Sequence, residues 1–360
     1  MARAADTVLF FVSFWDEPYL QAWPMELIHR HLERGDEVRV VKCRASLPTC
    51  FALKTHRDPV LCLRCASRAR YALRRTGVAR ANTSDVVPQP EAEAFEVPDF
   101  ADVEALKGLS VGGVNLGYGV AASLISGLRD HDFDLREHRK PVEANVRAAL
   151  HAFYFFKRYL AEHDVHRVYV FNGRFSEVRP LVELCKRAGI PFSTYEVGRS
   201  PSHFQVFHDT FVHDIPANVR AINALWAGAS EASGKRAIAA RWYEDRRGGV
   251  RQAHLPVFTG GQEHGRLPAE FDPSRRNIAV FNSSEDEFAA LGEVWVNPLY
   301  RDQSEALAGV LERVGPETGV RFYLRTHPNL AQLDNAQTRA LDVLEASHLT
   351  VLPGDGPTDT

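Results

Sequence analysis

The sequence predicts an α/β protein made of two Rossmann-like domains, each built on a parallel β-sheet. Short apolar runs alternate along the chain with amphipathic helical patterns, as they do in doubly wound sheets. The chain has 360 residues, 45% of them hydrophobic, and at about 150 residues per domain this length corresponds to two domains. A charged stretch rich in Gly and Pro, residues 248–276, interrupts the alternation once and marks a domain boundary.

The first domain is expected over residues 1–250. The apolar run at 7–14 predicts a buried first strand. The pattern then predicts a helix at 19–35 closed by Gly35, a strand at 37–43, a four-cysteine insertion at 43–65 and a basic helix at 66–77. An extended connection at 86–100 and a Gly-rich turn at 111–119 are expected next, followed by helices at 120–129 and 141–163. The last predicted elements are a strand at 166–171, a helix at 177–189, a strand at 190–197 and helical structure at 217–247. A right-handed crossover makes the last two strands parallel neighbours.

A linker at 251–275 precedes the second domain, which is expected over residues 276–360. Its predicted elements are strands at 277–284, 320–328 and 348–353 and helices at 304–315 and 331–346. An open parallel sheet of three strands leaves an unprotected edge. We therefore expect a partial, truncated second domain.

The net charge and the hydropathy of the sequence limit the binding partners and the cellular compartment that it predicts. The net charge of −3 and the pI near 6.6 provide no basic field that would predict nucleic acid as a partner. The N-terminal apolar run is too short to span a bilayer, and no small-residue cleavage site follows it. These features predict a cytoplasmic protein, in which disulfides are disfavoured.

Four of the five cysteines lie in the insertion at 43–65. Cys62 and Cys65 have the CxxC spacing that lets two thiolates chelate one ion, whereas six residues separate Cys43 from Cys50. We predict a structural zinc ion held by all four thiolates, with an iron–sulfur cluster or unmetallated thiols as the alternatives.

Polar residues follow several of the predicted strands, where open α/β sheets bind ligands. In FNGR (171–174), Asn172 and Arg174 are candidates to bind a sugar hydroxyl, carboxylate or phosphate, the alternative being a plain turn capped by Asn172. Asn115 belongs to a Gly-rich turn without the GxGxxG spacing, so we expect close approach to a ligand there but no dinucleotide fingerprint.

Two further motifs follow strands of the second domain. Arg325 and His327 in RTHPN (325–329) offer a cation and an imidazole donor to a phosphate, the alternative being a strand terminated by Pro with solvated charges. Ser283 and Ser284 in FNSSEDEF (281–288) are candidates to face a phosphate, and the alternative is a capping box completed by Glu287.

Three carboxylates are candidates for a general base. Asp16 and Glu17 follow the first strand, and Glu196 ends the strand at 190–197. Each has the alternative role of a solvated loop carboxylate.

The sequence resembles bacterial surface and capsule polysaccharide biosynthesis proteins that adopt the GT-B glycosyltransferase fold. The resemblance is carried, in order, by the cysteine segment at 43–65, VGGVNLGYGV (111–120), FNGR, FNSSEDEF and RTHPNL (325–330). It implies that the acceptor lies mainly on the first domain and the nucleotide sugar mainly on the second. It also assigns Arg325 and His327 to the donor phosphate, because the His-Pro pair resembles that of bacterial sialyltransferases and Kdo transferases.

The function implied by this resemblance is sugar transfer from a nucleotide sugar to a growing surface or capsular polysaccharide, with a free or lipid-linked glycan as acceptor. Peripheral association with an assembly complex at the inner face of the membrane is then expected. Asn115, Asn172 and Arg174 become acceptor-binding candidates. Two alternatives stay open: a nucleotide-sugar 2-epimerase, which shares the fold, and a non-catalytic, metal-containing scaffold. Proteins of this kind usually continue with a Ser/Thr-containing loop and an acidic helix start, and the sequence ends before either.

Overall fold

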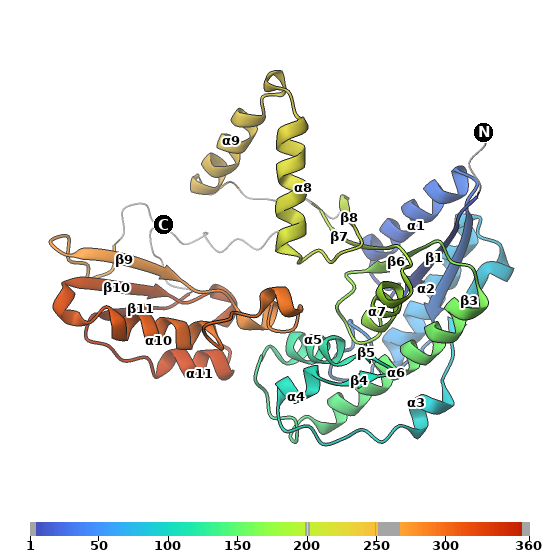
Figure 1. The fold of residues 1–360 in the computed structure, drawn as a ribbon, viewed down its shortest axis with the longest axis horizontal. Helices are drawn as coiled ribbons and strands as arrows, with labels where there is room; N and C mark the ends of the chain where they lie inside the picture. The colour runs from blue at the N-terminus through green and yellow to red at the C-terminus, as the bar shows by residue number, and fades with distance from the viewer. Residues whose placement is uncertain (1–4, 199, 201, 249, 251–266, 355–360) are drawn as a thin grey trace. The chain divides into compact units, whose positions relative to one another are not determined.

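The structure is a computed structural model that describes residues 5–354 except 199, 201, 249 and 251–266. The chain divides into two compact units (Figure 1). The first unit consists of Met1–Leu128, Asp132–Asp214 and Ala290–Gly292, and the second of Arg129–His131, Ile215–Ala289 and Glu293–Thr360. The expected linker at 251–275 lies largely outside the described residues.

The first unit contains a six-stranded sheet in the order β3-β2-β1-β6-β7-β8. Its strands are β1 (Thr7–Val12), β2 (Glu37–Cys43), β3 (Thr83–Val86), β6 (Arg167–Phe171), β7 (Phe192–Val197) and β8 (Phe204–His208). All neighbours are parallel except β7 and β8, which are antiparallel. The sheet is thus mixed but mostly parallel, and its order is compatible with a Rossmann-like fold.

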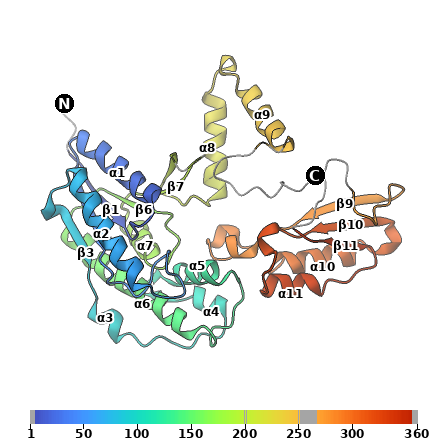
Figure 2. The same cartoon turned by 180° about the vertical axis from the view of Figure 1, so that it is seen from behind.

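Helices cover both faces of this sheet (Figures 1 and 2). Side chains alternate along β1, so Val8, Phe10 and Val12 pack with α1 (Pro18–Glu33) and α2 (Pro59–Thr76). Leu9 and Phe11 pack on the other face, in the cluster formed with α6 (Arg139–Glu162) and α7 (Arg179–Ala188). Burial on both faces explains why β1 is an unbroken apolar run.

The sequence did not predict every element of the first unit. The strand β3 has the sequence TSDV, which lacks an apolar run because β3 pairs only with β2 at the sheet edge. The antiparallel edge strand β8 lies between the expected elements at 190–197 and 217–247. The expected extended connection at 86–100 contains a short helix, α3 (Pro90–Ala94), which begins with proline in its first turn.

The helix α2 begins at Pro59, earlier than the expected start at residue 66. Asp58 caps it, because its Oδ1 accepts hydrogen bonds from the backbone N–H groups of Val60 (2.9 Å) and Leu61 (3.1 Å). Cys62 and Cys65 therefore lie on a helix and not in a loop.

A small substructure connects α3 to α6. It consists of α4 (Val103–Lys107), the hairpin strands β4 (Ser110–Val111) and β5 (Val114–Asn115), and α5 (Gly117–Leu128). Gly117 is required at the start of α5, since a Cβ atom there would lie 2.1 Å from the carbonyl oxygen of Leu106.

The second unit contains a parallel sheet in the order β11-β10-β9. Its strands are β9 (Arg276–Phe281), β10 (Val320–Arg325) and β11 (Leu349–Leu352), and its sheet-associated helices are α10 (Gln303–Arg313) and α11 (Ala336–Asp342). The α/β pattern expected for this region is confirmed, although α11 is shorter than the predicted helix at 331–346. Its start is fixed at Asn335 by a capping box with Thr338.

Two helices follow β8 in the chain, namely α8 (Ile215–Gly228) and α9 (Lys235–Arg247). They account for the helical structure expected at 217–247, and no residue of α8 is buried. Within the described ranges, no helix combines the length and the apolar character needed to cross a membrane.

Candidate functional site

The candidate site lies at the carboxyl edge of the six-stranded sheet, where β1 and β6 are neighbours. The chain runs from β1 to α1 on one face and from β6 to α7 on the other, so the order of strands reverses here. Such a switch point is where open α/β sheets bind ligands. Residues after β1, after β6 and at the end of β7 bring polar side chains to this edge.

Asn172 and Glu196 form the central contact. The Asn172 side-chain amide (Nδ2) donates a hydrogen bond of 2.7 Å to Glu196 Oε2, and the Asn172 backbone N–H donates to the Tyr195 carbonyl oxygen (3.0 Å). Sequence analysis assigned these two side chains to separate roles, acceptor binding and general base. The parallel pairing of β6 with β7 brings them together.

The turn after β6 has an unusual backbone that aims this amide. Asn172 (φ 56°) and Gly173 (φ 87°) are both left-handed, a region that asparagine tolerates and glycine adopts freely. A Cβ atom at Gly173 would lie 2.8 Å from the Phe211 ring and 2.9 Å from Thr194 Cγ2. The Asn-Gly pair is therefore needed both for its conformation and for the space that it leaves.

Burial raises the pKa of the Glu196 carboxyl above its ordinary value. The hydrogen bond from Asn172, another from the backbone N–H of Val197 to Oε1 (2.9 Å) and the charge of Arg174 oppose this rise. Glu196 is thus a carboxylate held at both oxygens with an increased affinity for a proton. These are the properties that a general base requires.

Arg174 contributes a cation beside this carboxyl. Its guanidinium lies over the Phe175 ring, 4.8 Å from the ring centroid. Burial, aided by the charge of Arg174, lowers the pKa of His213 to about 4. His213 is therefore neutral near pH 7, which leaves Arg174 as the cation of this pair.

Glu177 was missed by sequence analysis. It is completely buried, and its Oε1 accepts hydrogen bonds from Ser13 Oγ and from the backbone N–H of Phe51, both 3.0 Å long. Its Oε2 has no hydrogen-bond partner among the described residues. Burial raises its pKa. In the sequence, Glu177 is only the first residue of the helix predicted at 177–189, and no pattern marks it as buried.

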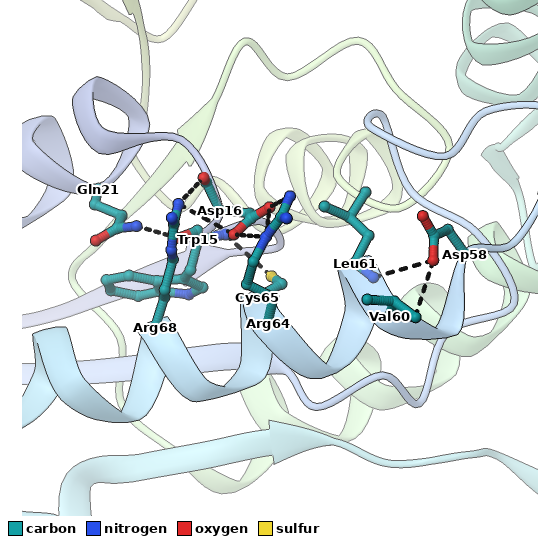
Figure 3. A network of polar contacts seen from close by, with 9 residues as sticks. All are labelled: Trp15, Asp16, Gln21, Asp58, Val60, Leu61, Arg64, Cys65 and Arg68. Atoms are coloured by element: carbon teal, nitrogen blue, oxygen red, sulfur yellow. Dashed lines mark hydrogen bonds and ion pairs between the residues drawn. The ribbon is translucent and has the colours of Figure 1, made fainter.

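Asp16 anchors α2 to the end of β1 (Figure 3). Arg64 Nε lies 2.8 Å from Oδ1 and 2.7 Å from Oδ2 of Asp16, and Arg68 Nη1 lies 3.1 Å from Oδ1. The carboxylate is buried, with 2% of its side chain exposed. Both oxygens are thus occupied by guanidinium donors, which favours a structural role over that of a base. The other candidate, Glu17, is exposed.

Asn115 is engaged in local structure. Its Nδ2 donates to the Lys107 carbonyl oxygen (2.8 Å), and its Oδ1 accepts from the Tyr118 backbone N–H (3.1 Å). This arrangement connects α4 to the first turn of α5. Nothing in it favours the predicted contact with an acceptor.

The four cysteines of the insertion come from different elements. Cys43 ends β2, Cys50 lies in the irregular segment between β2 and α2, and Cys62 and Cys65 lie on α2. Cys65 Sγ accepts a hydrogen bond from the backbone N–H of Trp15 (3.2 Å; Figure 3). Across the described part of the chain, no three His, Cys, Asp or Glu side chains are grouped so that they could hold a metal ion. The predicted zinc site thus stays a prediction.

The predicted donor residues lie at the carboxyl ends of β9 and β10. The His327 backbone N–H donates to Asn282 Oδ1 (2.9 Å), so the two strand ends are in contact, and Arg325 Nη2 donates to the Gly354 carbonyl oxygen (3.3 Å). Ser284 is completely buried and its hydroxyl donates to Asp286. Ser283 donates its backbone N–H to Gln303 Oε1 (2.8 Å).

The capping box that was the alternative role for Ser284 is not formed. A short 3-10 turn, Glu285–Glu287, follows, and the Ser284 side chain makes no capping hydrogen bond to it.

Comparison with known proteins finds no protein-family model that matches the chain and no curated protein with significant similarity.

Proposed function

We propose that this chain is a glycosyltransferase of the GT-B type, which transfers a sugar from a nucleotide sugar to a growing surface or capsular polysaccharide or its lipid-linked precursor. Two α/β units with parallel strands are compatible with this architecture. The observation that carries the proposal is Glu196, a partly buried carboxyl with a raised pKa at the switch point of a Rossmann-like sheet.

In the proposed reaction, an acceptor hydroxyl oxygen bonds to the anomeric carbon of the donor while its proton passes to Glu196. The bond between the anomeric carbon and the phosphate oxygen breaks, and its electron pair stays on the phosphate. Arg325 and His327 stabilise that developing charge. Asn172 orients the base, and Arg174 binds the acceptor beside it.

Replacement of Glu196 tests this assignment. Glu196→Gln keeps the size of the side chain but removes the proton acceptor, so we expect transfer from a nucleotide-sugar donor to fall about 10²- to 10⁴-fold. Donor affinity should be unchanged, and the control Glu162→Gln should retain activity because Glu162 is exposed at the end of α6. Full activity of Glu196→Gln would exclude Glu196 as the base.

The pH profile gives a second test of the same residue. A base must be ionised to act, so activity should fall as the pH drops through the pKa of Glu196. Since burial raises this pKa, the acid limb should lie above the ordinary glutamate value of about 4.3. Product analysis then separates transfer from 2-epimerisation, which converts the nucleotide sugar without an acceptor.

The donor contacts are tested by binding. His327→Ala should weaken nucleotide affinity by about 1 to 3 kcal/mol, the range for a hydrogen bond to a charged group. Unchanged nucleotide affinity in a folded His327→Ala variant would show that His327 does not bind the donor. The role of Glu196 is tested independently by its own replacement.

The proposal includes a structural zinc ion on Cys43, Cys50, Cys62 and Cys65, and no step of the reaction passes through it. Thiolates are ligands that zinc prefers, but the structure does not gather these four into a ligating group. Elemental analysis of protein purified without added metal decides the matter. About one equivalent of zinc, lost in Cys62→Ser, supports the site; iron would indicate a cluster, and neither metal would exclude both.

A further inference from the structure

A basic pocket lies in the first unit, between α2 and the strands β2 and β3. Its volume is about 500 Å³, which is within the range of small-molecule sites. Five cations and one acid line it: Lys42, Arg44, Arg70, Arg74, Arg80 and Asp85. None of them belongs to the site at the switch point.

The single acid is already neutralised. The register of β2 with β3 places Lys42 opposite Asp85, and the two form an ion pair. Four arginines thus surround the pocket with no further acid in its lining. This excess of positive charge is local to the pocket, because the whole chain has a net charge of −3.

These arginines are exposed and make few contacts with the protein. Arg44, Arg74 and Arg80 form no ion pair with any residue in the described part of the chain. The contact that Arg70 makes is a 3.3 Å hydrogen bond to Ser67 Oγ. Their guanidinium groups are therefore available to a ligand.

The spacing on α2 explains how the pocket forms. Ala66, Arg70 and Arg74 are four residues apart, so they lie on one face of the helix. The small Ala66 side chain leaves space beside Cys43 at the end of β2. Like charges four residues apart destabilise a helix slightly, and an anion bound between them would offset this cost.

We propose that this pocket binds a ligand carrying two or more phosphate groups, held by Arg44, Arg70, Arg74 and Arg80. The planar guanidinium fork matches phosphate oxygens in pairs, and four such groups exceed what a single phosphate requires. The phosphates belong either to a soluble metabolite or to a lipid headgroup. The inference goes beyond the proposed sugar transfer and does not depend on it.

The test is calorimetric titration of the full chain with inorganic pyrophosphate and with inorganic phosphate. We expect saturable binding that is tighter for pyrophosphate. Arg74→Ala combined with Arg80→Ala should weaken it at least about tenfold, as expected for lost hydrogen bonds between charged groups. The matched control is Arg75→Ala, because Arg75 is on the same helix but outside the pocket, over the Tyr71 ring. It should leave the affinity unchanged.

The His327→Ala variant separates this pocket from the proposed donor site. Pyrophosphate binding that survives the double replacement but is lost in His327→Ala would overturn the pocket proposal. An equal loss of pyrophosphate affinity in Arg75→Ala would also overturn the proposal, since the affinity would then depend on the overall positive charge of α2 and not on the pocket. Circular dichroism confirms that each variant is folded.

Vesicles distinguish the two sources of phosphate. Phosphatidylcholine vesicles with and without phosphatidylinositol 4-phosphate, whose headgroup carries two phosphates, are sedimented with the protein and with the double variant. Binding that requires both this lipid and the two arginines identifies a lipid headgroup, whereas pyrophosphate binding alone identifies a soluble ligand. If neither probe binds saturably, the proposal fails.

Discussion

At the residue scale, the fully buried Glu177 and the partly buried Glu196 lie near the same sheet edge, and the sequence identified only Glu196. Glu196 was a candidate because it ends a strand, a position that carries chemistry in α/β sheets. Asn172 and Arg174 were found by the same argument. Glu177 was not, because its burial depends on Ser13 and Phe51, which are distant in the sequence. No local pattern reports such contacts.

The burial of Glu177 predicts how the free energy of unfolding depends on pH. Its pKa is higher in the folded chain than in the unfolded chain, so the folded state binds the proton more tightly. The contribution of this group to the free energy of unfolding is therefore full at low pH and is lost as the pH rises above about 4.3, the unfolded value.

Replacing Glu177 removes this dependence. Glu177→Gln should become progressively more stable relative to the wild type as the pH is raised from 4 towards 7, in urea unfolding at each pH. The exposed Glu17→Gln serves as control and should show a constant difference. A difference for Glu177→Gln that does not change with pH would contradict the assignment.

At the element scale, α2 shows what a sequence pattern can and cannot provide. Its basic C-terminal half was predicted, and its last residue, Thr76, is followed by Gly77 in the left-handed conformation. Its first turns were assigned to a loop because the cysteines dominated the interpretation, although Asp58 followed by Pro59 is a helix-start signal. The edge strands β3 and β8 lacked any strong local signal. Pairing with a neighbour defines them, and that information is not local.

The ion pairs of Arg64 and Arg68 with Asp16, which attach α2 to the segment after β1, are expected to stabilise the fold. Removing both guanidinium groups with Arg64→Ala and Arg68→Ala leaves the buried Asp16 carboxylate without its partners. We expect the free energy of unfolding to fall, because the buried carboxylate then lacks the two cations that compensate its charge. Denaturant titration measures it.

A third replacement supplies the control. Asp16→Asn in the double variant removes the buried charge and should restore part of the lost stability. If it destabilises further, the two arginines act through packing and not through the charge of Asp16.

At the scale of the whole chain, each unit has its own hydrophobic core. Two clusters, which contain Phe10 and Phe11, lie on opposite faces of the six-stranded sheet, and a third, which contains Leu324, belongs to the second unit. The alternation of strands and helices predicted two α/β units. The sequence assigned the helical structure at 217–247 to the first domain, whereas α8 and α9 belong to the second compact unit.

Separate cores predict separate unfolding transitions in calorimetry. Leu324→Ala and Leu181→Ala each remove a fully buried side chain, one from each unit, and each should cost about 2 to 5 kcal/mol. We expect each replacement to lower the temperature of one transition and to leave the other in place. A single transition moved equally by both variants would show that the units unfold together.

The Asn-Gly sequence at 172–173 also predicts a route of chemical ageing. In peptides, an asparagine followed by glycine loses its side-chain amide as ammonia most readily, because the glycine nitrogen attacks the side-chain carbonyl with little steric hindrance. Deamidation here would replace the donor facing Glu196 with a second carboxylate, at a contact now 2.7 Å long. Aged preparations should therefore accumulate an acidic form on isoelectric focusing, in which Glu196 has lost the partner that orients it.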